Sequence, residues 1–89
     1  MTWNRLAIAD RDTIMSYIAQ DNPVAALELD EMIEEKADKL LLHPTMYRVG
    51  RQAGTREMVL HPNYILIYRI KPDEIEVLRV VHAAMKWPE

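Results

Sequence analysis

The chain has 89 residues, no cysteine and a formal net charge of −3 at pH 7. This length suits a single domain, residues 1–89, with one core, and a composition of 49% hydrophobic and 28% charged residues excludes an intrinsically disordered chain. The lack of cysteine excludes disulfides, thiolate metal sites and thiol redox chemistry. Because no apolar run approaches the roughly 20 residues of a membrane span and the N-terminus lacks the apolar stretch of a secretion signal, we expect a cytoplasmic protein without membrane contact.

The net charge hides an asymmetry between the two halves of the chain. Residues 1–42 carry four basic and nine acidic side chains, a net of −5, whereas residues 43–89 carry seven basic and five acidic ones, a net of +2. The positive charge concentrates in Arg48, Arg51, Arg56, Arg69 and Lys71. Since affinity for phosphate backbones depends on clustered Lys and Arg, any contact with nucleic acid must be local.

The first half of the chain predicts a short strand and a helical hairpin. Residues 2–6 suit a brief strand, and a helix over 7–19 is indicated by one stripe at spacings of three and four: Ala7, Arg11, Ile14, Met15 and Ile18. Asn22 can cap a second helix that has Pro23 in its first position. The short connection makes the two helices antiparallel.

The second predicted helix runs to about Leu42, where His43-Pro44 stops it because proline disfavours helical geometry in the residue before it. The predicted inward face consists of Ala25, Leu29, Met32, Ile33, Ala37, Leu40 and Leu41. The predicted outward face consists of Glu28, Glu31, Glu34, Glu35 and Asp38. Residues 45–54, which contain both glycines, have no clean period and predict a basic connecting loop.

The remaining chain predicts a three-stranded antiparallel meander. Two extended segments between Gly54 and Ile70 are joined by a turn at 61–63, and a third runs from Ile75 to His82. Because residues 64–70 are apolar on both faces, we expect this strand to be central and covered. The predicted architecture is an α+β fold with the helical hairpin packed on one face of an antiparallel sheet.

This order of elements resembles the RelE/ParE superfamily of toxins, and its ParE-like branch most closely. The resemblance covers essentially the whole chain and rests on 21–23, 42–44, 53–57, 61–64 and 80–84, which read DNP, LHP, AGTRE, HPNY and VVHAA. It implies the toxin of a two-gene toxin–antitoxin module, held inactive in a hetero-oligomer by a cognate antitoxin. A dimer of the toxin remains an alternative, and no cofactor or metal is expected.

The family implies two alternative activities. ParE-like members are associated with inhibition of DNA gyrase, whereas RelE-like members cleave messenger RNA on the ribosome. Cleavage without a metal needs converging cationic and acid–base side chains, yet Ile65 stands where RelE-like nucleases commonly carry an arginine. Arg56 and His82 remain as candidate catalytic residues. We therefore favour gyrase binding over the nuclease, and a third alternative keeps the fold and the antitoxin without toxicity.

Each candidate residue also has a structural interpretation. Arg56 could contact the target, the antitoxin or a phosphate, or could pair with Glu57 or another surface acid. His82 could act as an acid or base, although a hydrogen-bonded structural role is favoured. The remaining candidates for contact with the target or antitoxin are Arg48, Arg51, Lys86 and Trp87. The structural alternative for Arg48 and Arg51 is an ordinary solvated loop, and for Trp87 it is closure of the core. For His61 and His43, each next to a proline, local turn chemistry is favoured over metal binding.

Overall fold

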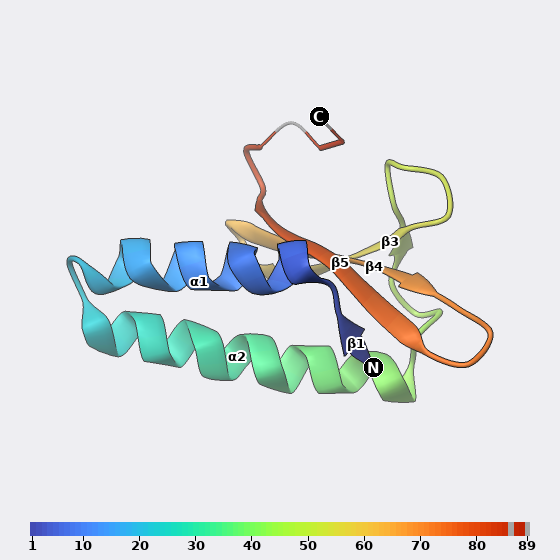
Figure 1. The fold of residues 1–89 in the computed structure, drawn as a ribbon, viewed down its shortest axis with the longest axis horizontal. Helices are drawn as coiled ribbons and strands as arrows, with labels where there is room; N and C mark the ends of the chain where they lie inside the picture. The colour runs from blue at the N-terminus through green and yellow to red at the C-terminus, as the bar shows by residue number, and fades with distance from the viewer. Residues whose placement is uncertain (86, 89) are drawn as a thin grey trace.

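The computed structural model describes residues 1–85, 87 and 88. The elements in chain order are β1 (Thr2–Trp3), α1 (Arg5–Ala19), α2 (Pro23–Leu42), β2 (Arg48–Val49), β3 (Arg56–His61), β4 (Tyr64–Ile70) and β5 (Ile75–His82). The two helices lie side by side on one face of the sheet (Figure 1), and Trp87 packs on the other face. The predicted α+β architecture is confirmed.

The helical hairpin begins earlier than predicted. α1 starts at Arg5 because the side chain of Asn4 accepts a hydrogen bond from the backbone N–H of Leu6 at 2.9 Å and so caps the helix. The predicted strand over 2–6 is therefore wrong beyond Trp3, and Leu6 is an exposed residue of the first helical turn. The predicted start of α2 is confirmed, since the side chain of Asn22 accepts from the N–H of Ala25 at 3.0 Å and Pro23 follows it.

One face of α2 packs on the sheet and on α1, as the periodicity predicts. Its buried residues are Ala26, Leu29, Ile33, Ala37 and Leu40. The five predicted outward acids are exposed, but Leu41 is 54% exposed, so its predicted place on the inward face is wrong. Leu41 follows Leu40 by about 100° around the helix and points away from the core. Neither helix in the described part of the chain combines the length and the apolar character that crossing a bilayer requires.

The sheet has five strands in the order β1-β5-β4-β3-β2. The antiparallel meander β3-β4-β5 is confirmed. The sheet as a whole is mixed and not antiparallel as predicted, because β1 pairs with β5 in parallel, with Thr2 opposite Glu76. The prediction of a loop over 45–54 is wrong at Arg48–Val49, which form β2 against β3. Two residues are too few to show the alternation that identifies a strand.

Strand β4 is central and covered on both faces, as predicted. Under the helices lies the main core, which includes Leu66 and Tyr68 of β4. On the opposite face Ile65 and Ile67 form a second, smaller cluster with Val81, and Trp87 packs against it. The alternation of β4 therefore supplies two separate apolar layers, one under the helices and one under the C-terminal segment.

Candidate functional site

Arg56 lies at the start of β3, directly opposite Tyr68 of β4. Its guanidinium Nη1 donates to the backbone carbonyls of Tyr47 at 2.8 Å and Thr45 at 3.2 Å. The hydroxyl of Tyr68 donates to the carbonyl of Pro44 at 2.6 Å. The two facing side chains thus hold the irregular segment that leads from α2 to β2. The structural alternative in which Arg56 pairs with Glu57 is wrong, because Glu57 has other partners.

Glu57 is a buried carboxylate, 2% exposed, between two arginines of the predicted basic loop. Its Oε1 accepts from Arg48 Nε at 3.1 Å and Nη2 at 2.8 Å, and its Oε2 accepts from the backbone N–H of Arg51 at 3.0 Å. The Arg51 guanidinium lies 3.5 Å from the same Oε2. Burial alone would raise the pKa of Glu57, but these hydrogen bonds and charges hold that pKa below its ordinary value.

The connection from β2 to β3 needs glycine at two points. The N–H of Gly50 donates to the carbonyl of Thr55 at 2.7 Å, and a Cβ at Gly50 would lie 2.1 Å from Thr55 Oγ1. Gly54 has a φ of +80°, in the left-handed region that glycine favours. The loop can therefore fold closely enough to place Arg48 and Arg51 on the same carboxylate.

His82 ends β5 and is exposed. Its Nδ1 accepts a hydrogen bond from the backbone N–H of Ala84 at 3.0 Å, and its ring lies edge-on to Tyr64 with the ring centroids 5.4 Å apart. His61 repeats this arrangement in the β3–β4 turn, where its Nδ1 accepts from the N–H of Asn63 at 3.1 Å. The turn chemistry predicted for His61 is confirmed, and in both histidines Nε2 is the nitrogen left for other partners.

The structure does not bring Arg56 and His82 together. Arg56 is paired with Tyr68, whereas His82 is paired with Tyr64 at the other end of β4. Tyr68 and Tyr64 are four residues apart, which is about 13 Å along β4, and β3 and β5 are separated by two strand spacings of about 4.8 Å each. The two side chains therefore cannot act on one phosphodiester in this conformation. Among the described residues no group of three or more His, Asp or Glu side chains could hold a metal ion.

Trp87 lies on the face of the sheet opposite the helices. Trp87 packs on the cluster of Ile65 and Val81, and the guanidinium of Arg79 lies 5.5 Å from the centroid of its ring. The indole Nε1 is buried and, among the described residues, has no hydrogen-bond partner. Lys86 lies outside the described residues.

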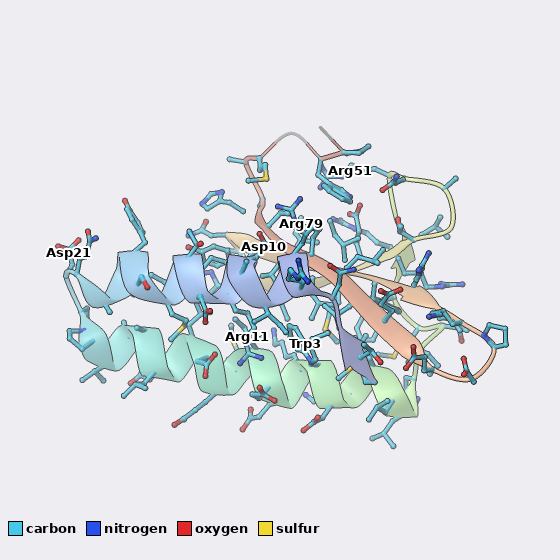
Figure 2. All side chains as sticks on the ribbon, viewed as in Figure 1. Trp3, Asp10, Arg11, Asp21, Arg51 and Arg79 are labelled. Atoms are coloured by element: carbon cyan, nitrogen blue, oxygen red, sulfur yellow. The ribbon has the colours of Figure 1, made fainter. Side chains whose placement is uncertain are left out.

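Sequence reasoning missed the clamp between α1 and β5. Asp10 Oδ2 accepts from Arg79 Nε at 2.7 Å and from the backbone N–H of Val80 at 2.9 Å, and Oδ1 accepts from Arg79 Nη2 at 3.1 Å. Figure 2 shows Asp10 and Arg79 reaching toward one another from the two elements. A register shift between β4 and β5 lies next to this contact. The contact was missed because no local sequence pattern links residues that are 69 positions apart.

Comparisons with known proteins agree with this fold along nearly the whole chain. The sequence model described as the ParE toxin of the type II toxin–antitoxin system parDE matches residues 1–87. The chain is 40% identical to Y4kP of Sinorhizobium fredii, a provisionally assigned toxin, over 98% of this chain and 91% of the relative. It is 32% identical to toxin RelE2 of Caulobacter vibrioides over 94% of each chain.

Among solved structures, a chain of the chromosomal ParDE toxin–antitoxin system from P. aeruginosa superposes with a TM-score of 0.82. The sequence identity is 27%, and the match covers 91% of each chain. The resemblance inferred from the residues is confirmed by these findings.

Proposed function

Because the chain belongs to the ParE toxin family of type II toxin–antitoxin systems, we propose that it arrests growth by binding DNA gyrase. The family implies a cognate antitoxin, and the proposed complex is a cytoplasmic hetero-oligomer in which that antitoxin blocks the toxin. Residues 1–89 act as a single toxin domain. In this role the module serves plasmid stabilisation, and the toxin works by protein–protein contact without a cofactor.

The observation that supports gyrase binding over RNA cleavage is that the candidate cationic side chains already have partners within the protein. Arg56 is bound to backbone carbonyls, and Arg48 and Arg51 share Glu57. Metal-free RNA cleavage requires cations and acid–base groups that converge on one phosphate, and Arg56 lies at the opposite end of the sheet from His82. Contact with a protein needs no such convergence, and the half-exposed sides of Arg48 and Arg51 suit it.

The direct test adds purified toxin, without ribosomes, to a gyrase supercoiling reaction. We expect loss of supercoiling or trapped, cleaved DNA at a several-fold molar excess of toxin, and full recovery when the antitoxin is added first. A topoisomerase that relaxes DNA without gyrase serves as the control enzyme. Unchanged supercoiling at that excess contradicts the proposal.

A second candidate function is ribosome-dependent cleavage of messenger RNA. It is favoured by the 32% identity to toxin RelE2 and by the exposed His82, whose Nε2 is available for proton transfer. His82→Ala is the informative variant, because Arg56→Ala also releases the segment before β2. If the chain is a nuclease, messenger RNA should stay intact after induction of the His82→Ala variant. Induction of the His61→Ala variant should still give cut messenger RNA.

One induced culture separates these functions. Plasmid DNA and messenger RNA are extracted from the same cells. A gyrase inhibitor should leave relaxed or broken plasmid, whereas a nuclease should leave cut transcripts. Normal growth with both nucleic acids intact would contradict both and leave the non-toxic alternative.

A further inference from the structure

Three exposed large apolar side chains lie in the short stretch from the end of α2 to β2. Leu42 is 74% exposed, Met46 is 64% exposed and Val49 is 74% exposed. Leu42 ends α2, and the N–H of Met46 donates to the carbonyl of His43 at 3.2 Å, so the chain turns directly after the helix. Val49 lies in β2 at the edge of the sheet. Large apolar side chains gathered on one surface usually indicate a place where a partner binds.

The sheet fixes the shape of this stretch. Arg56 Nη1 holds the carbonyls of Thr45 and Tyr47, and the hydroxyl of Tyr68 holds the carbonyl of Pro44. The ring of Tyr47 lies edge-on to the ring of Tyr68, with the centroids 6.4 Å apart. Backbone that is already held in place loses little conformational entropy when a partner binds. The exposed apolar side chains are therefore presented by a pre-organised segment.

The charge around this segment is positive. From Lys39 to Arg56 the sequence contains four basic residues and no acidic one. Glu57, the next residue, is shared by Arg48 and Arg51. Arg56 is bound to neutral carbonyls, and no ion pair joins it to another described residue. Three guanidinium groups and one carboxylate leave a net charge of +2 beside the exposed apolar side chains.

The other large exposed apolar side chains have different electrostatic surroundings. Most of them belong to the helical hairpin, namely Leu6, Ile8, Tyr17, Val24, Leu27 and Leu41. Residues 1–42 carry a net charge of −5. A groove of about 560 Å³ between α1 and the C-terminal end of β5 lies at the other end of the sheet, where Tyr64 and His82 line it. An acidic partner is therefore attracted to residues 42–49 and repelled by the hairpin.

These features describe the partner. A phosphate backbone is held mainly by cations and gains little from large apolar side chains, so nucleic acid fits this surface poorly. In a symmetric dimer the surface would meet itself and bring like charges together, which disfavours a second copy of the chain. A protein surface with acidic groups around an apolar recess matches both the charge and the apolar side chains.

We propose that Leu42, Met46 and Val49, with Arg48 and Arg51 beside them, form the surface that contacts gyrase, and that the contacted patch of gyrase is acidic with an apolar centre. The proposal rests on the proposed function and names the part of the toxin that carries it. The apolar side chains supply most of the binding energy, and the arginines select an acidic partner.

The direct test measures the concentration of full-length toxin that halves gyrase supercoiling. Leu42→Glu and Met46→Glu each place a negative charge on this surface, and each should raise that concentration about tenfold or more. Leu27→Glu is the matched control, because Leu27 is also an exposed leucine of α2 but lies about 22 Å along the helix from Leu42. It should change the concentration by less than about twofold. Equal inhibition by the unmodified toxin and all three variants overturns this surface and leaves the proposed function standing.

Arg51 tests the contribution of charge. Its backbone N–H, which a substitution keeps, donates to Glu57 at 3.0 Å, whereas its guanidinium lies 3.5 Å from the same carboxylate oxygen. Arg51→Gln should therefore keep the fold, inhibit supercoiling more weakly and make inhibition less dependent on salt. Arg51→Lys retains the charge and should inhibit like the unmodified toxin. Unchanged inhibition and salt dependence in Arg51→Gln would overturn the acidic patch on the partner.

The melting temperature and isothermal titration calorimetry with the cognate antitoxin separate the other occupants. The Leu42→Glu and Met46→Glu toxins should keep the unmodified Tm and bind antitoxin within about twofold of the unmodified Kd. A variant that keeps its Tm but loses the antitoxin shows that the surface belongs to the antitoxin, and overturns the proposal. So does self-association of the toxin that Leu42→Glu abolishes, because the surface then belongs to a second copy. If the unmodified toxin leaves supercoiling unchanged, the proposed function fails, and gyrase as the partner of this surface fails with it.

Discussion

At the residue scale, Glu57 shows how one buried carboxylate organises a basic loop. Glu57→Gln removes the charge that Arg48 and the Arg51 backbone stabilise, so we expect the free energy of unfolding at pH 7 to fall by about 1–3 kcal/mol. Because the pKa is lowered in the fold from 4.5, this contribution is complete above about pH 4.5 and is lost as the pH falls through the lower folded value.

Urea unfolding of Glu57→Gln and of the unmodified protein at several pH values measures this effect. The difference between the two should be largest at pH 7 and should shrink below about pH 4.5. Glu35→Gln, on the exposed face of α2, is the control and should stay within about 0.5 kcal/mol. A difference that grows on acidification would contradict the assigned direction of the pKa shift.

Arg56 gives a second prediction at this scale. Its guanidinium holds two carbonyls of the segment before β2, so Arg56→Ala should lower the free energy of unfolding by about 1–2 kcal/mol and speed amide exchange in residues 45–49. Arg69→Ala is the matched control, because Arg69 is an exposed arginine of the same sheet in a surface ion pair with Glu76, a contact of about 0–1 kcal/mol. Equal effects of the two substitutions would show that the carbonyl contacts carry little stability.

At the element scale, the Asp10 clamp fixes α1 on β5. Asp10→Ala removes three charge-assisted hydrogen bonds and leaves the N–H of Val80 without its partner. We expect a loss of roughly 2–3 kcal/mol in chemical unfolding. Asp12→Ala, two residues away on the exposed side of α1, should change stability by less than about 0.5 kcal/mol. A similar loss in both variants would point to a general effect of charge on the helix.

The same elements show what sequence reasoning could and could not reach. The bounds of α2 and of the meander follow from local signals, namely the Asn22-Pro23 cap and the alternation of 64–70, and the structure confirms them. β2 was missed because its two residues are defined only by their partner strand. The Asp10–Arg79 contact and the separation of Arg56 from His82 were missed because both depend on strand register, which residue spacing alone does not give.

At the scale of the whole molecule, the helices cover one face of the sheet, and Trp87 packs on the smaller apolar cluster of the other face. What remains open is the edge of β5 beyond β1, together with the groove beside it. Two of the exposed large apolar residues, Tyr17 and Met85, line this groove.

An antitoxin that binds the folded toxin must stabilise it, because a ligand that binds only the folded state adds RT ln(1 + [L]/Kd) to the free energy of unfolding. Free antitoxin at 100 times its Kd should add about 2.7 kcal/mol, which raises the Tm of a domain of this size by roughly 10–20 °C at about 4–8 °C per kcal/mol. Differential scanning calorimetry of the toxin with increasing antitoxin measures the shift. A Tm that stays constant across the titration would mean that the antitoxin does not bind preferentially to the folded toxin.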